Sequence, residues 1–304
     1  MKKVLVISNM YPSKEHLAYG IFVKNQVEQL EQEGIETLLA VNTNPATGKK
    51  NVLFKYAKWA RNVMRTFRAN KREISLTHSH YVFPSGLFSY YLKKRYNIPY
   101  IVTAHGGDIN KMAKKSGQIR QFTEKILQRA DHVIAVGEEL ATTIETNFHV
   151  SNDKISVMSM GIDRTVFKEA DNKQHCAAEL GMDPEKTNFL FVGNIIREKG
   201  VTELVQAFNK VSESIPGRSA LYCVGSTKDT NFTSKVKELA KGNADIHFIE
   251  PMPQTELAHY FQAADVLVLP SYIEGLGLVA LEAMSCGTPV IASDVGGLNY
   301  MLAD

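Results

Sequence analysis

The chain has 304 residues, of which 44% are hydrophobic and 22% charged, and a net charge of +3, so it is long enough to form two globular domains. No apolar run reaches the length of a membrane span, and the run after Lys3 is too short for a signal peptide. Its three cysteines, Cys176, Cys223 and Cys286, are odd in number and widely spaced, which argues against a disulfide scaffold or zinc site and indicates a reducing, cytoplasmic compartment.

The chain begins with an alternation of strand and helix. Residues 4–8 form a short apolar run that predicts a buried strand, and a loop containing Gly20 follows it. Residues 22–33 have the spacing of an amphipathic helix, and residues 35–41 predict the next strand. A start of this kind is typical of a doubly wound α/β domain.

Residues 56–70 predict a helix with one basic face. Lysines and arginines recur there at three- and four-residue steps, opposite an apolar face. The basic residues are Lys55, Lys58, Arg61, Arg65, Arg68 and Arg72. Two interpretations stay open: a solvated helix that packs on its own domain, or a patch spanning residues 55–72 that attracts anionic lipid headgroups at a membrane surface.

Two histidine motifs follow strands in the first half. The strand at residues 74–77 ends in Thr-His-Ser-His-Tyr, but no third ligand lies near His78 and His80 in sequence, so structural histidines are a better interpretation than a metal pair. The strand at residues 99–103 leads into Ala-His-Gly-Gly-Asp. This motif puts the titratable imidazole of His105 on a flexible loop at the carboxyl end of a parallel strand, where open α/β sheets bind ligands. The alternative is a structural histidine.

The first domain is expected to end at an irregular polar passage that begins at Gly161. We place an N-terminal domain at residues 1–165 and a C-terminal domain at residues 166–304. The first carries 24 Lys and Arg against 14 Asp and Glu, and the second carries 11 against 18. This asymmetry indicates either an anionic partner for the first domain or attraction between the two domains. The other elements expected in the first domain are helices at 84–96, 123–130 and 138–148 and strands at 131–136 and 155–159.

The second domain repeats the alternation of strands and helices. Its most informative stretch is 265–294, where two apolar strands enclose a short helix at 278–286 that ends before Gly287. Leu278, Leu281 and Met284 recur in it at helical spacing. The preceding elements are expected at 189–192, 220–225 and 246–249 (strands) and at 201–211, 234–240 and 255–264 (helices).

A glycine-rich turn, Glu274-Gly275-Leu276-Gly277, opens the short helix. Its glycines let backbone N–H groups approach a ligand at the positive end of the helix dipole, which predicts a site for an anion such as phosphate. Glu274 lies before the helix and Glu282 within it, so both carboxylates are expected to face one cleft. The fold expected is a pair of doubly wound α/β domains whose strand ends face each other across that cleft.

Four segments together resemble one protein family. In order and spacing they are similar to the retaining glycosyltransferases of family 4, which have the GT-B fold of two Rossmann-like domains. The resemblance covers essentially the whole chain, and its most specific part is the glutamate pair joined to Glu-Gly-Leu-Gly-Leu. The segments are FVGNIIREKGVTELVQAF (191–208), ADVLVLPSYIEGLGLVALEAMSCGTPVIASDVGG (264–297), TAHGGD (103–108) and GIDRTVF (161–167).

The resemblance implies a nucleotide-diphosphate sugar bound mainly by the C-terminal domain, with no metal ion or other cofactor required. It implies that Lys199 acts on the leaving diphosphate, and that Glu274 and His105 contact the donor sugar. Retention would follow if the acceptor attacks the face that the diphosphate leaves, with a phosphate oxygen taking the acceptor proton. The implied nucleotide-sugar-binding residues are Gly20 beside the phosphates, Gly225 and Met252 at the base and ribose, Gly275, Leu276, Gly277, Leu278 and Val279 as backbone donors to the diphosphate, and Glu282 on the ribose hydroxyls.

The sequence departs from the family pattern in two places. Asn194 stands where the family usually has an arginine that acts on the diphosphate together with the lysine, and Arg197 in the same loop is the candidate to replace it. The chain also stops at Asp304, shortly after the Ser-Asp-Val-Gly-Gly turn, where the family normally continues. We therefore expect a truncated second domain.

The expected function is transfer of a sugar from a nucleotide-diphosphate donor, with UDP as the expected nucleotide, to a hydroxyl of a glycan or lipid-linked acceptor in cell-envelope polysaccharide synthesis. The expected location is cytoplasmic, with peripheral attachment to the inner membrane face as an option and no nucleic-acid partner. Alternatives are a sugar-nucleotide 2-epimerase of the same fold and a non-catalytic nucleotide-sugar-binding remnant. A dinucleotide-dependent oxidoreductase fits less well, because the Gly-x-Gly-x-x-Ala match at residues 275–280 falls late in its domain.

Overall fold

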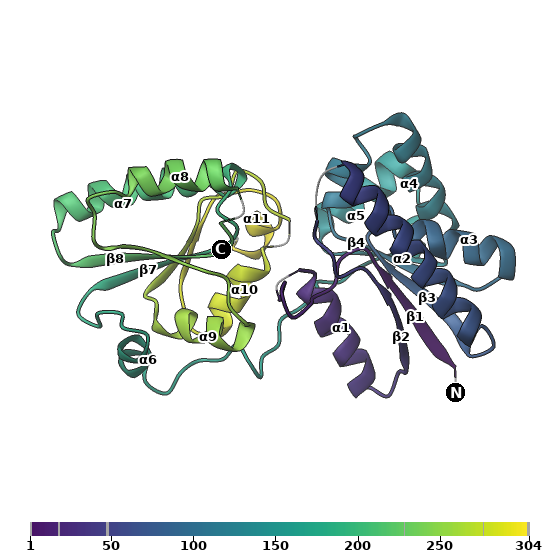
Figure 1. The fold of residues 1–304 in the computed structure, drawn as a ribbon, viewed down its shortest axis with the longest axis horizontal. Helices are drawn as coiled ribbons and strands as arrows, with labels where there is room; N and C mark the ends of the chain where they lie inside the picture. Colours follow the sequence, from purple (N-terminus) through teal and green to yellow (C-terminus); the bar gives the residue numbers. More distant parts are fainter. Residues whose placement is uncertain (1, 18, 47–48, 228, 276, 303–304) are drawn as a thin grey trace. The chain divides into compact units, whose positions relative to one another are not determined.

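The computed structural model describes residues 2–17, 19–46, 49–227, 229–275 and 277–302. The chain divides into two compact units, Met1–Met160 and Gly161–Asp304. Each unit is a parallel sheet with helices packed on it (Figure 1). This is the α/β architecture of two doubly wound domains that the sequence predicts, and the division falls where the irregular passage begins.

The first unit has a six-stranded sheet in the order β2-β1-β3-β4-β5-β6. After β2 the chain crosses back over β1, so the switch in strand order lies between β1 and β3. The carboxyl ends of these strands meet at one edge, because Ser8 pairs with His80, which pairs with Thr103. The strands are β1 (Lys3–Ser8), β2 (Thr37–Val41), β3 (Ile74–His80), β4 (Tyr100–Ala104), β5 (His132–Ala135) and β6 (Ile155–Val157).

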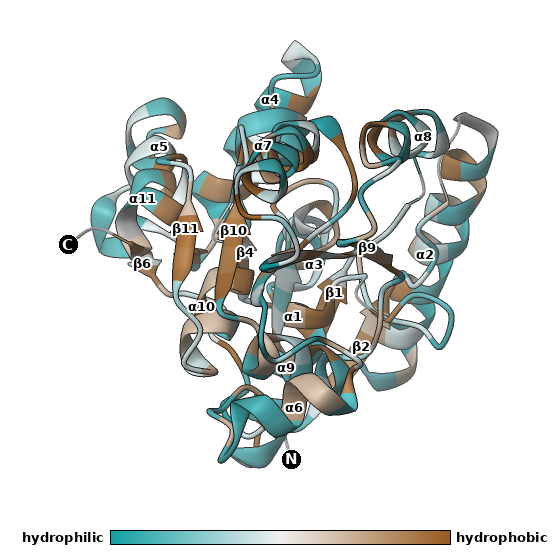
Figure 2. Cartoon of the chain, turned by 90° about the vertical axis from the view of Figure 1, so that its left-hand side faces the viewer, coloured by the Kyte–Doolittle hydropathy of each residue, from teal (hydrophilic) through white to brown (hydrophobic). Residues whose placement is uncertain are grey.

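Strand β1 is the centre of the first unit's core. Its side chains alternate, as in any strand, so that Leu5 and Ile7 pack toward helix α2 and Val6 packs toward helix α1. Figure 2 shows the strand in brown, the colour of hydrophobic residues. The helices of the unit are α1 (Ile21–Gln32), α2 (Lys49–Asn70), α3 (Gly86–Tyr96), α4 (Gly117–Arg129) and α5 (Glu138–Phe148), with a π-helix η1 (Gly107–Met112) and a 3-10 turn η2 (Asn152–Lys154).

Helix α2 buries one face and exposes the other, as its sequence predicts. Trp59 is 3% exposed, and its Nε1–H donates to the Ala40 carbonyl at 2.8 Å. One prediction for this helix is wrong: Lys55 does not belong to the exposed basic face. Its Nζ donates to the carbonyl oxygens of Asn44 and Ala46 at 3.2 and 2.8 Å, which leaves it 8% exposed. Lys55 lies one turn before Trp59 and therefore faces the body of the unit.

The second unit has a five-stranded sheet in the order β11-β10-β7-β8-β9. The chain runs outward through β8 and β9, then returns to the other side of β7, so its switch point lies between β7 and β10. The strands are β7 (Thr187–Val192), β8 (Ser219–Val224), β9 (Ile246–Ile249), β10 (Val266–Leu269) and β11 (Val290–Ala292). The helices are α6 (Lys173–Glu179), η3 (Arg197–Lys199, 3-10), α7 (Val201–Ser214), α8 (Thr230–Leu239), α9 (Gln254–Ala263), α10 (Leu278–Ser285) and α11 (Gly297–Met301).

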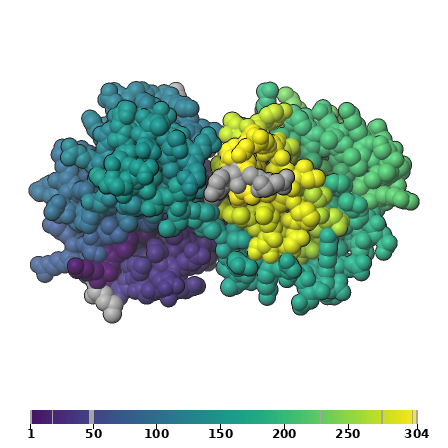
Figure 3. Space-filling model, turned by 180° about the vertical axis from the view of Figure 1, so that it is seen from behind, coloured from purple at the N-terminus to yellow at the C-terminus, as the bar shows by residue number. Residues whose placement is uncertain are grey.

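The short helix α10 forms where the sequence predicts it, and Gly287 follows it in the left-handed conformation with φ +78°. The face that it buries carries small side chains. Met284 is 46% exposed, whereas Ala280 and Ala283 are fully buried. Small side chains let the helix lie close to the sheet, which the spacing of the larger residues did not indicate. The last part of the chain lies on the surface of its own unit (Figure 3).

Gly200 shows how tightly the loops of the second unit pack. It lies between η3 and α7 with φ +65°, and a Cβ there would come within 1.9 Å of the Pro270 carbonyl oxygen. Gly217 is a matched control, because it has φ +68° and nothing within 4 Å of an added Cβ.

We expect Gly217→Ala to destabilise the second unit by about 1 to 2 kcal/mol through its backbone conformation alone. Gly200→Ala should cost about 1 to 3 kcal/mol more, because the Pro270 backbone must also move. Urea unfolding followed by circular dichroism measures both changes. Equal losses for the two variants would contradict the packing described for Gly200.

Candidate functional site

The carboxyl edge of the second sheet brings together most of the residues that the sequence singles out. Asn194 follows β7, Gly225 follows β8, Met252 follows β9, and the turn at Glu274 follows β10. The loops after β7 and β10 leave neighbouring strands at the switch point. In open α/β sheets, ligands bind outside the carboxyl ends of the strands at such a point.

An ion pair joins the two loops at the switch point. The Nζ of Lys199, at the end of η3, lies 2.6 Å from Oε2 of Glu274. Ser271 Oγ donates to the same oxygen at 3.3 Å, and the Tyr272 N–H donates to the Glu198 carbonyl at 2.9 Å. The side chains of the pair are only 23% and 15% exposed, so water screens it less than a surface pair. The structure thus places two of the three predicted catalytic residues in direct contact.

The turn after β10 leads into the N-terminus of α10. Gly277 has φ +72°, and an added Cβ would come within 2.6 Å of Leu298, so the turn requires glycine there. The Gly275 N–H donates to Oε1 of Glu274 at 3.1 Å. Leu278 and Val279 begin the helix, where backbone N–H groups have no partner within it. Leu276 lies outside the described residues.

Two glycines that the sequence analysis did not assign support this turn. A Cβ at Gly296 would come within 2.2 Å of the Glu274 carbonyl oxygen, and the Gly297 N–H donates to the Gly275 carbonyl at 2.7 Å. The paired glycines of Ser-Asp-Val-Gly-Gly were the signal for this close approach. The end of the described chain therefore forms one wall of the turn.

Glu282 lies apart from the ion pair and is 7% exposed. Its Oε1 accepts a hydrogen bond from Nε2 of Gln254, at the start of α9, at 3.2 Å. Burial raises the pKa of Glu282 to about 7, and the Gln254 hydrogen bond only partly opposes this. Glu274 and Glu282 thus have different partners, and Gln254 is a neighbour that sequence reasoning missed.

Asn194 and Arg197 are both exposed in the loop after β7. Arg197 lies close enough to Tyr272 to influence its hydroxyl: a hydrogen bond to Glu203 raises the pKa of Tyr272, and the Arg197 charge opposes that rise. That Arg197 replaces the arginine missing at position 194 stays a prediction.

Gly225 and Met252 occupy the loops after β8 and β9. A Cβ at Gly225 would come within 1.8 Å of the Gly193 carbonyl oxygen, so only glycine lets these two loops approach. Met252 is half-buried and packs against the core cluster of the second unit.

His105 lies at the corresponding edge of the first sheet, after β4. Its ring centroid is 4.8 Å from that of Phe22 and 4.6 Å from that of Tyr81, and its Nε2 lies 3.3 Å from Nδ1 of His80. Burial lowers its pKa to about 3, so the ring is neutral at neutral pH. The expected titration near neutral pH is therefore wrong, since the ring packs against two aromatic side chains, although the residue is partly exposed. A π-helix begins two residues later.

Asp108 holds the His105 loop in place. Its carboxylate accepts hydrogen bonds from the backbone N–H groups of Val82 at 2.7 Å and of His105 and Ile109 at 3.1 Å each. It is 2% exposed, and burial raises its pKa to about 6 against these hydrogen bonds. Asp108 thereby ties the loop after β3 to the loop after β4.

Gly20 precedes α1 with φ +75°, and an added Cβ would lie 2.7 Å from the Met10 carbonyl. Packing within the β1 loop therefore already requires glycine at this position. Among the described residues, no group of three or more His, Cys, Asp or Glu side chains has a geometry that could hold a metal ion.

The buried carboxyl of Glu282 makes stability depend on pH. Its pKa is raised in the folded state, so ionisation of this carboxyl favours the unfolded chain. The resulting loss of stability grows as pH rises from about 4.5 to about 7. We expect Glu282→Gln to be more stable than the wild type at pH 8 by roughly 2 to 3 kcal/mol and no more stable at pH 4. Denaturant unfolding at both values measures this, and a gain independent of pH would contradict the assignment.

Two family models match the chain. The model described as Glycosyltransferase Family 4 matches residues 19–166, and the model described as Glycosyl transferases group 1 matches residues 172–304. Together they account for both units apart from the first strand and a short connecting segment.

Curated proteins and solved structures of this kind are also similar to the chain. It is 32% identical to alpha-maltose-1-phosphate synthase of Mycolicibacterium smegmatis over 77% of this chain and 63% of that protein. It is 26% identical to TuaC of Bacillus subtilis, a glycosyltransferase assigned to teichuronic acid biosynthesis, over 98% of this chain and 82% of that protein. The structure of Anabaena HepE in complex with UDP-glucose matches with a TM-score of 0.73 and 17% identity, over 100% of this chain and 83% of that one.

These matches agree with the two parallel sheets of the structure. The chain spans only 53–63% of the length of seven of the curated relatives that it matches. Within that span the family is clear: the chain belongs to the group 1, family 4 glycosyltransferases of the GT-B fold.

Proposed function

We propose that this chain transfers a sugar, with retention of anomeric configuration, from a UDP-linked donor to a hydroxyl of a glycan or lipid-linked acceptor in cell-envelope polysaccharide synthesis. The observation that carries the proposal is the pair of Lys199 and Glu274 at the switch point of the second sheet, 2.6 Å apart. HepE, which shares the fold, binds UDP-glucose, and TuaC supports a role in an envelope polymer.

The chemistry follows from the donors and acceptors at that edge. Lys199 has three N–H donors, so it can keep Glu274 and still donate to a diphosphate oxygen. The first N–H groups of α10 add positive potential at the same edge. Together they stabilise the negative charge that develops on the leaving diphosphate, which is the task a metal ion performs in other transferases, so we propose that none is required.

Glu274, held by Lys199 and Ser271, remains an acceptor for hydroxyls of the donor sugar. The bond from the anomeric carbon to the phosphate oxygen breaks, and the bond to the acceptor oxygen forms on the same face. A phosphate oxygen takes the acceptor proton, so no protein nucleophile is needed. Glu282 accepts hydrogen bonds from the ribose hydroxyls, for which its ionised form is suited.

Nucleotide binding tests this assignment. Lys199→Ala and Glu282→Ala should each weaken binding of UDP-glucose by roughly 10- to 100-fold, because each loses a hydrogen bond to a charged group. Isothermal titration calorimetry measures the change. The matched control is Lys173→Ala, which breaks a lysine–carboxylate pair of 2.7 Å with Asp265 at the amino end of β10.

The control variant should bind like the wild type. Unchanged affinity in both Lys199→Ala and Glu282→Ala would remove the basis of the proposal. Incubation of the donor without acceptor separates the other interpretations: a 2-epimerase converts it to an isomer, whereas a binding remnant leaves it intact and also fails to glycosylate any acceptor.

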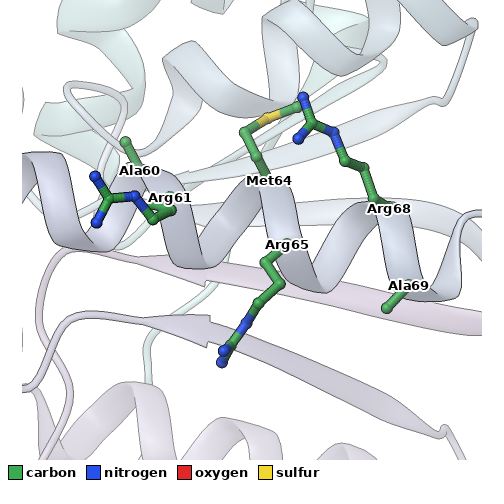
Figure 4. Close-up of a pocket in the computed structure, with 6 residues that line it drawn as sticks. All are labelled: Ala60, Arg61, Met64, Arg65, Arg68 and Ala69. Carbon is green, nitrogen blue, oxygen red and sulfur yellow. The ribbon is translucent and has the colours of Figure 1, made fainter.

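We further propose that the exposed face of α2 binds an anionic membrane surface, on the cytoplasmic side. Arg61, Arg65 and Arg68 extend from this helix, as Figure 4 shows. They help to line a surface hollow of about 790 Å³. Leu53 and Phe54, at the start of the same helix, are 75% and 73% exposed. Basic side chains beside exposed apolar ones favour a lipid interface over a merely solvated helix. None of the described helices is apolar over a stretch long enough to cross a bilayer.

Vesicle sedimentation tests the membrane proposal. The wild type should bind phosphatidylglycerol vesicles, more weakly as salt rises, and ignore phosphatidylcholine vesicles. Charge reversal at Arg61, Arg65 and Arg68 together should weaken binding roughly 100-fold or more, at about 1 kcal/mol for each charge removed. Reversal of three exposed lysines of the α8 region is the control with the same net charge: Lys235→Glu, Lys237→Glu and Lys241→Glu. Equal binding of the two triple variants would contradict the assignment.

A further inference from the structure

Three histidine rings form a column at the carboxyl edge of the first sheet. The ring centroids of His78 and His80 are 4.5 Å apart, and those of His80 and His105 are 5.5 Å apart. His78 Nε2 lies 2.8 Å from Thr103 Oγ1, and His80 Nδ1 lies 3.3 Å from His105 Nε2. The middle ring is fully buried, and its Nε2 has no hydrogen-bond partner among the residues that the structure describes.

This buried, unpartnered nitrogen decides where the protons of the column lie. A neutral imidazole carries a proton on only one of its two nitrogens, and one of the two rings must donate the hydrogen bond between His80 Nδ1 and His105 Nε2. If His105 were the donor, the proton of His80 would lie on its Nε2, which would be a buried N–H without an acceptor. If His80 is the donor, its Nε2 carries no proton and only a lone pair is left without a partner. A buried N–H without a partner is the rarer of the two situations, so the second arrangement is favoured.

We propose that His80 is a positioning residue that donates its Nδ1–H to Nε2 of His105 and so fixes His105 as the tautomer protonated on Nδ1. His105 then offers one neutral N–H donor at Nδ1 to a ligand at this edge. Sugar hydroxyls and phosphate groups both accept such a hydrogen bond, and a neutral donor orients them without delivering a proton.

The surroundings of His105 fix its position as well as its tautomer. Its backbone N–H is held by Asp108 at 3.1 Å, and its ring packs against Phe22 and Tyr81. Both histidines stay neutral because burial lowers their pKa values, to about 3 for His105 and well below the ordinary value for His80. With the backbone and the rings held, His80 controls which nitrogen of His105 carries the proton.

Nitrogen chemical shifts of the imidazole rings test the tautomer directly. In the full chain with ¹⁵N-labelled histidine, two-bond proton–nitrogen spectra should show Nδ1 protonated and Nε2 bare in both His80 and His105. Spectra of His80→Asn and His105→Gln provide the assignments. A wild-type His105 protonated on Nε2 would overturn the proposal, whatever the variants do.

Variants of His80 then separate positioning from packing. His80→Asn keeps an N–H near the place of Nδ1 and should preserve the His105 tautomer. His80→Leu keeps the bulk of the side chain but removes the donor, so His105 should then adopt both tautomers. Thermal unfolding checks that both variants fold. Loss of the tautomer in His80→Asn as well as His80→Leu, with both folded, would contradict the role of the donated hydrogen bond.

The step from tautomer to ligand rests on the proposed function and on the role that the family resemblance implies for His105, which is contact with the donor sugar. His80→Leu should reduce the ratio of UDP-glucose affinity to UDP affinity roughly 3- to 10-fold, the effect of one hydrogen bond, and His80→Asn should restore it. An unchanged ratio would overturn this step. Failure of the wild type to bind either nucleotide would instead count against the proposed function, and the spectra would still decide the tautomer.

Discussion

The second unit is organised around an ion pair at the one place in its sheet where the strand order reverses. Lys199 and Glu274 come from loops that follow adjacent strands, β7 and β10, and leave the sheet in different directions. Their contact, reinforced by the Tyr272 N–H, keeps these loops from separating. The pair also places a partly buried positive group and a partly buried negative group side by side at the switch point. A ligand with both an anionic group and hydroxyl groups could bind to both.

Close approach of backbones makes this geometry attainable. Gly200, Gly225 and Gly296 each lie where a Cβ would come within 2.2 Å or less of a carbonyl oxygen in a neighbouring loop. The loops around the ion pair therefore pack main chain against main chain, with little side-chain volume between them. Such close packing requires glycine at these three positions of the chain.

The sequence predicted the α/β class and most elements because continuous apolar runs and helical spacing are local signals. The sequence did not predict the position of a side chain where a residue distant in sequence determines that position. The spacing around Lys55 suggested a basic face, but the carbonyl groups of Asn44 and Ala46 draw the side chain inward. In α10 the apolar spacing predicted the helix but not its buried face, because close packing on the sheet buries Ala280 and Ala283. The motif around His105 did not indicate that Phe22 and Tyr81 pack against its ring.

The distance in sequence between the members of the ion pair has a consequence for how the protein is made. Lys199 and Glu274 are 75 residues apart, and the turn that carries Glu274 is braced by Gly297, near the end of the described chain. The first unit has its own sheet and core and can become compact while the second is still being synthesised. The second sheet cannot join β10 to β7 until both strands are present, so its ligand edge forms late. A ligand that binds at this edge would therefore require the segment around Gly297 to be in place, and would favour chains in which that segment has folded.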